Sequence, residues 1–141
     1  MKDEVYWLAI QQKYWLIPPE TIKKTLQELG SMEKFWNASD SYLSKLGLRD
    51  ETIRKFSEYK KSVRMDYFER QLEELHRNNI RLIRYIDEDY PSSLKSACWP
   101  PGLRPPRVLF QKGSLLDFSG CVAIGGTRSC SDYARREAFI M

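Results

Sequence analysis

The sequence contains very few of the residues that hold structural metal ions. Its 141 residues include one histidine, His76, and three cysteines, Cys98, Cys121 and Cys130, which form no CxxC pair. Structural zinc sites usually take a tetrahedral set of cysteine and histidine ligands at short, regular spacings. We therefore expect no metal site and no cofactor, and we expect the thiols to be reduced, as is usual inside cells.

Long apolar runs are also absent. The chain begins Met1-Lys2-Asp3-Glu4, and it lacks the stretch of roughly 18 apolar residues that would suggest a membrane span. A charged start without a following apolar core is unlike a secretory signal peptide. The sequence therefore predicts a cytoplasmic protein that has no membrane partner.

The sequence does contain enough apolar material for a packed core. Hydrophobic residues make up 42% of the chain and aromatic residues 13%, which excludes disorder as the overall state. A chain of this length has room for one compact domain, or for a small domain and part of a second. The 23 Lys and Arg against 19 Asp and Glu favour a polyanionic partner without requiring one.

The first half of the chain has helical hydrophobic spacing. Apolar residues that recur along one face predict an amphipathic helix near residues 19–29 and a longer helical segment at 50–77, which is either one helix or two. The residues on these two faces are Ile22, Leu26 and Leu29, and then Ile53, Phe56, Val63 and Tyr67. Boundary signals are Pro18-Pro19 at a start, Gly30 at an end, Ser31 and Asp50 as N-caps, and Gly47 after a short helical turn.

The second half of the chain has short apolar runs separated by proline and glycine. Residues 80–86, 107–110 and 121–124 are predicted strands, and the last is apolar enough to be buried on both faces. Residues 99–106 read WPPGLRPP and cannot form regular structure. Residues 131–141 have helical composition, so the chain ends with the first half of a βαβ unit and we expect it to be truncated.

Residues 122–131, VAIGGTRSCS, form the sharpest motif. A buried strand that leads through two glycines into a helix lets backbone N–H groups and the helix dipole face an anion, and Arg128 can add a bidentate fork for a phosphate. The alternative is the ordinary strand-to-helix turn of an α/β protein with Arg128 in solvent. The segment matches neither GxGxxG nor the P-loop pattern.

Four motifs in this order resemble the DprA/Smf family. The first motif is DYPSSL at 89–94, the second is PPRVLFQKG at 105–113, the third is VAIGGTR at 122–128 and the fourth is SDY at 131–133. They are similar to the YPxxL, PPxxLxxKG, AIVGSR and SxYG segments of that family. The resemblance covers residues 80–141 well and the helical half loosely.

The resemblance implies a fold and a function. The fold is α+β overall, with a helical SAM-like or helix-hairpin-helix domain at 1–79 and the start of an α/β extended Rossmann domain at 80–141. The implied function is a single-stranded DNA-binding recombination mediator of natural transformation, not an enzyme, which protects incoming DNA and helps load a RecA-type recombinase. Further implied partners are a single-stranded DNA-binding protein and, at full length, a second copy of the chain. The implied phosphate-binding residues are Gly125, Gly126, Thr127, Arg128, Ser131 and Tyr133, with no catalytic residue.

The helical half offers two candidate hairpins. Residues 46–50, LGLRD, resemble one whose Gly47 and adjacent amides could touch a phosphate, whereas residues 16–20, LIPPE, carry prolines that supply no N–H. We favour packing or protein interaction over DNA contact for this half. Its tryptophans Trp7, Trp15 and Trp36 are expected in the core, and Trp99 is left open as a core or base-stacking residue.

Charged clusters have simple explanations. The basic residues of segment 50–77 alternate with acidic ones and predict a solvated helix face, and residues 87–89, DED, predict a polar turn and not a magnesium site. His76 is given no catalytic role. The basic residues concerned are Arg54, Lys55, Lys60, Lys61 and Arg64.

Two other functions remain open. One is a nucleotide-processing Rossmann enzyme similar to phosphoribohydrolases, which would need a second glycine-rich motif beyond residue 141 and would release bases from nucleoside monophosphates. The other is a protein-interaction fragment, in which residues 1–80 would fold alone and capture a partner without binding DNA.

Overall fold

The computed structural model describes residues 2–13, 16–96, 104–113 and 131–132. This part of the chain contains seven helices and two strands. The broad expectation of an α+β protein is confirmed. The elements are α1 (Lys2–Gln12), α2 (Pro19–Leu29), α3 (Met32–Trp36), α4 (Asp40–Lys45), α5 (Asp50–Ser62), α6 (Met65–Arg77), β1 (Ile80–Arg84), α7 (Ser92–Ser96) and β2 (Val108–Lys112).

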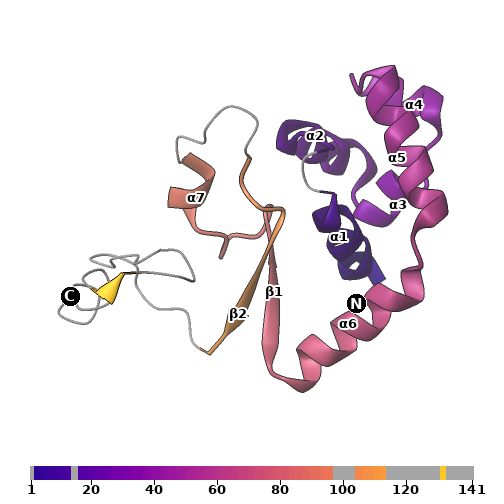
Figure 1. The fold of residues 1–141 in the computed structure, drawn as a ribbon. Coiled ribbons are helices and arrows are strands. Elements are labelled where there is room, and N and C mark those ends of the chain that lie inside the picture. Colours follow the sequence, from indigo (N-terminus) through magenta and orange to yellow (C-terminus); the bar gives the residue numbers. More distant parts are fainter. Residues whose placement is uncertain (1, 14–15, 97–103, 114–130, 133–141) are drawn as a thin grey trace.

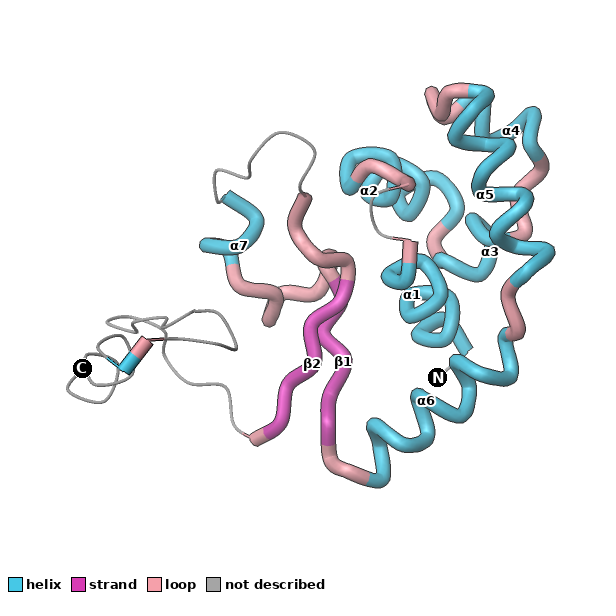
Figure 2. Tube along the Cα trace, viewed as in Figure 1, coloured by secondary structure: helices cyan, strands magenta, loops and turns pink. Residues whose placement is uncertain are grey.

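Helices α1 to α6 form a bundle, and the two strands lie beside it (Figure 1). Helix α6 packs on β1, while α1 contacts α3, α6 and β2. Figure 2 shows the strands between the bundle and the short helix α7. Among the described helices, none has both the length and the apolar character to cross a membrane.

Local signals set the boundaries of the early helices as predicted. Gly30 ends α2 in the left-handed region at φ 78°, and its N–H donates to the carbonyl of Leu26. The Ser31 hydroxyl caps α3 by accepting from the backbone N–H of Lys34 at 3.2 Å.

The predicted N-cap of α5 is wrong by one residue. Asp50 is the first residue of α5, and its N-cap is Arg49. An acidic side chain in the first turn still interacts favourably with the helix dipole.

The segment at 50–77 is two helices. Val63 and Arg64 have extended backbone, with ψ angles of 137° and 109°, and this separates α5 from α6. Ile53 and Phe56 are buried as expected, but Tyr67 is 49% exposed and its predicted place on the same face is wrong. After the break α6 runs in a new direction and buries Phe68 instead.

Strands β1 and β2 pair antiparallel, with Ile80 opposite Lys112 and Arg84 opposite Val108. This confirms two of the three predicted strands, with bounds shifted by up to two residues, and the third, at 121–124, lies outside the described residues. Strand β1 ends at Arg84 because a tight turn follows, in which the backbone N–H of Asp87 donates to the Arg84 carbonyl.

One hydrophobic cluster joins the bundle to the strands. It contains Trp7 and Trp36 of the helices together with Leu82 of β1 and Val108 of β2. The prediction that these two tryptophans pack in the core is confirmed, while Trp15 and Trp99 lie outside the described residues. The strands therefore share their apolar face with the helices.

Candidate functional site

Most of the predicted phosphate site lies outside the described residues. This applies to Gly125, Gly126, Thr127, Arg128 and Tyr133. Ser131 is described, and its side chain is exposed. The structure does describe the first two of the four motifs, which precede this site in the chain.

The first and second motifs are joined by Tyr90. Its side chain is 2% exposed, and its hydroxyl donates to the carbonyl of Pro106 at 2.8 Å. The ring also packs edge-on against Tyr85, with 5.3 Å between centroids. The backbone continues the connection, because the N–H of Tyr85 donates to the carbonyl of Arg107 at 2.8 Å. Tyr90 thus fixes the first motif against the second.

Arg107 of the second motif connects the strands to the helical bundle. Its side chain is 0% exposed and donates through Nη1 to the Pro105 carbonyl and through Nη2 to the Ile17 carbonyl, each at 2.7 Å. Burial lowers the pKa of Arg107 to about 10, so the guanidinium is still charged at neutral pH. The 16–20 segment therefore has a structural role through Ile17.

Gln11 of α1 completes this connection. Its Oε1 accepts from the backbone N–H groups of Arg107, at 2.7 Å, and Val108, at 3.3 Å. We call these contacts together the Arg107 joint. They join the Arg107 guanidinium to the Ile17 and Pro105 carbonyls, and the Gln11 side chain to the N–H groups of Arg107 and Val108. Sequence patterns gave no sign of it, beyond an arginine placed directly after two prolines in an apolar strand.

The acidic residues at 87–89 form a polar turn, as predicted. Asp87 accepts from the backbone N–H of Arg84 at 2.7 Å and from the Arg84 Nη2 at 2.7 Å. Burial opposes ionisation of Asp87, but these hydrogen bonds outweigh it and hold the pKa of the carboxyl below its usual range. Asp89 is paired with Arg81. Within the described residues, no three His, Cys, Asp or Glu side chains gather as a metal site would require.

The hairpin between α4 and α5 uses its amides internally. The N–H of Gly47, which has φ 90°, donates to the Ser44 carbonyl at 2.9 Å, and the N–H of Leu48 donates to the Leu43 carbonyl at 3.2 Å. This pattern closes the end of α4. The two amides that the sequence offered to a phosphate are therefore already bonded.

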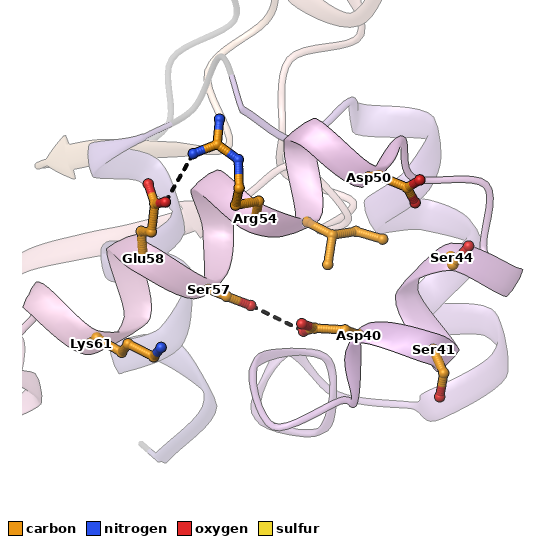
Figure 3. A pocket seen from close by; sticks show the side chains of 9 residues that line it. Asp40, Ser41, Ser44, Asp50, Arg54, Ser57, Glu58 and Lys61 are labelled. Carbon is orange, nitrogen blue, oxygen red and sulfur yellow. Dashed lines mark hydrogen bonds and ion pairs between the residues drawn. The ribbon is translucent and has the colours of Figure 1, made fainter.

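A groove of about 570 Å³ lies between α4 and α5 (Figure 3). Ser57 donates to the Asp40 carboxylate at 3.0 Å across it, and Arg54 pairs with Glu58 at 3.0 Å on its rim. Its charged lining consists of three carboxylates and two cations, so it suits a polyanion poorly. The lining residues are Asp40, Ser41, Ser44, Asp50, Ile53, Arg54, Ser57, Glu58 and Lys61.

Helix α5 has the solvated basic face that the sequence predicts. Besides the Arg54 pair, Lys55 contacts Glu51 at 2.6 Å, and Lys60 donates to the carbonyl of Trp36 at 3.2 Å. Surface pairs of this kind add little stability. Arg54 and Lys55 are each paired with a carboxylate four residues away on the same helix, as expected for a solvated helix face.

The buried phenols give a test of this packing by pH. Burial raises the pKa values of Tyr59 and Tyr90 to about 12, and the Tyr59 hydroxyl donates to the Ala9 carbonyl at 2.7 Å. The stability that the two neutral phenols supply is complete below pH ~10, the unfolded value, and is lost as pH rises through about 12. A phenolate absorbance titration should show these two tyrosines ionising last. Tyr90→Phe should remove one late step, and a single transition near pH ~10 for all tyrosines of the folded protein would contradict the assignment.

No family model, curated protein or solved structure matches the chain.

Proposed function

We propose that this chain is a single-stranded DNA-binding protein of the DprA/Smf type, acting in recombination during natural transformation. In this proposal residues 1–79 form a SAM-like or helix-hairpin-helix domain and residues 80–141 begin an extended Rossmann domain. The proposal depends mainly on one observation. Two of the four ordered motifs, separated in sequence, are held together by the hydrogen bond from Tyr90 to Pro106.

The binding chemistry in this proposal is phosphate recognition. The backbone amides at Gly125, Gly126 and Thr127 would donate to a phosphate, Arg128 would bind it with two N–H donors, and Ser131 and Tyr133 would shape the pocket. Such contacts carry no base information, so binding should tolerate changes of sequence and weaken as salt increases. The Arg107 joint would hold the neighbouring strands firmly against the bundle.

The proposed partners follow from the same function. They are single-stranded DNA, a RecA-type recombinase that is loaded onto it, and a single-stranded DNA-binding protein. In this proposal the protein acts as a homodimer in the cytoplasm.

Arg128→Ala tests the phosphate assignment directly. A charged hydrogen-bond pair contributes about 1.5–3 kcal/mol, so the affinity for a labelled oligodeoxythymidine should fall about tenfold or more. Fluorescence anisotropy at fixed low salt measures this, with circular dichroism to confirm folding. Arg54→Ala is the matched control, because Arg54 is an exposed arginine paired with Glu58, and it should leave affinity unchanged. Equal affinity for Arg128→Ala and the parent chain would reject the assignment.

A further inference from the structure

Tyr67 is an exposed aromatic residue whose position is fixed by its neighbours. It is 49% exposed, yet its ring packs edge-on against Phe68 with 5.2 Å between centroids. Its hydroxyl accepts from the Gln71 side-chain amide at 2.8 Å. A side chain held at both ends has already lost much of its rotamer freedom, so binding a ligand would cost it little further entropy.

Tyr67 lines a groove at the break between α5 and α6. Figure 1 shows the two helices running in different directions from this point. The groove has a volume of about 620 Å³, which is within the range of small-molecule sites. The lining residues are Gln12, Ser62, Val63, Arg64, Tyr67, Phe68, Arg70, Gln71 and Glu74.

Two arginines are placed together at this groove by Asp66. Arg64 donates to Asp66 through Nε at 3.2 Å and Nη2 at 2.8 Å, and Arg70 donates through Nη2 at 2.6 Å. Both guanidiniums are more than two-thirds exposed. The Asp66 carboxylate orients the guanidinium groups of both arginines. The Nη1 atom of each has no acceptor among the described residues.

The charge of the lining distinguishes this groove from the one in Figure 3. The lining of this groove includes Arg64, Arg70 and one carboxylate, that of Glu74, and the Asp66 carboxylate beside it pairs with both arginines. The α4–α5 groove is lined by three carboxylates and two cations. An aromatic platform beside arginines is the usual arrangement for a single strand, in which bases stack on the ring and phosphates meet the cations.

We propose that the groove between α5 and α6 binds single-stranded DNA, with a base stacked on Tyr67 and neighbouring phosphates held by Arg64 and Arg70. The inference rests on the proposed function for its ligand and adds a second contact, on the helical half. The residues involved are separate from those of the Gly125–Arg128 segment, so the two contacts can be tested separately.

Tyr67→Ala tests the stacking contact. Loss of one base–aromatic stack should weaken binding of the full chain to a labelled oligodeoxythymidine about tenfold. Tyr67→Phe keeps the ring and should retain most of the affinity. Phe110→Ala is the matched control, because Phe110 is a similarly exposed aromatic residue, at 54%, on β2, and it should leave affinity unchanged.

Arg70→Gln tests the phosphate contact within the same assay. It should lower affinity a few-fold and reduce the slope of log affinity against log salt by about 0.7, the value for one phosphate on a single strand. Arg54→Gln is the control, because Arg54 is likewise exposed and paired with a carboxylate four residues away.

The results separate this inference from the proposed function. Unchanged affinity for Tyr67→Ala would overturn the proposal that this groove binds DNA, and it is the result expected if the groove binds a polypeptide instead. The Arg128 pocket is tested separately by Arg128→Ala. A loss with Phe110→Ala equal to that with Tyr67→Ala also overturns the groove. Loss with Tyr67→Ala but none with Arg128→Ala supports the groove and rejects the Arg128 pocket. A parent chain that binds no oligonucleotide overturns both.

Discussion

Replacing Arg107 with alanine should destabilise the protein by about 3–5 kcal/mol. The change leaves the buried carbonyls of Ile17 and Pro105 without their donor, at about 1–3 kcal/mol each, and opens a cavity where a fully buried side chain was. A domain of this size has a total stability of roughly 5–15 kcal/mol, so the variant should be close to unfolding. Urea denaturation followed by circular dichroism measures the loss.

Two further variants show whether the geometry of Arg107 matters. Arg107→Lys keeps the charge but cannot reach both carbonyls, so its stability should be intermediate. Arg104→Ala is the control, because the Arg104 side chain is half-buried and its ion pair among the described residues is a long one, 3.6 Å from Glu20. It should change stability by less than about 0.5 kcal/mol. If Arg107→Ala were as stable as Arg104→Ala, the Arg107 joint would have no energetic importance.

Trp36→Ala should have a second large effect, also about 3–5 kcal/mol, because it removes a large core side chain. The Trp36 ring lies 5.5 Å from Phe56, 5.9 Å from Tyr59 and 5.9 Å from Tyr6, measured between centroids. It therefore joins α3 to α1 and α5. Its removal takes one ring contact from each of Tyr6, Phe56 and Tyr59 and leaves a cavity between the three helices.

Far-ultraviolet circular dichroism in urea should follow this variant, since indole fluorescence would change with the substitution itself. Trp36→Phe keeps part of the ring volume and should lose less than half as much stability. Tyr67→Ala, at an exposed position, should stay within about 1 kcal/mol of the parent. Comparable losses at Trp36 and Tyr67 would show that the aromatic cluster is not the core of the bundle.

The helix ends could be predicted from sequence because their causes are local. A glycine that adopts a left-handed backbone and a serine that caps the next turn act within a few residues, and Gly30 and Ser31 do so. The break at Val63 and Arg64 has no such signal, since neither residue is glycine or proline. It is explained by tertiary packing, because α6 must place Phe68 and Leu72 against its neighbours.

The contacts that join the motifs could not be predicted in the same way. Tyr90 reaches Pro106 across 16 residues and Arg107 reaches Ile17 across 90, and no periodic pattern reports such distances along the chain. The order of the motifs suggested a family, but not which side chains are structural. The prediction that Tyr67 lies on the apolar face of segment 50–77 is wrong for a related reason. The hydrophobic spacing places Tyr67 on that face only if one helix runs through residues 63 and 64.

The Arg107 joint tolerates substitution at some of its positions and not at others. In the hydrogen bonds described above, the side chains of Gln11 and Arg107 bond main-chain groups, which are the N–H groups of Arg107 and Val108 and the carbonyls of Ile17 and Pro105. Because any residue supplies a carbonyl, position 17 and position 105 can change identity without losing these hydrogen bonds. The connection between the helical and the strand halves can therefore persist through wide divergence, provided that one glutamine and one arginine are kept.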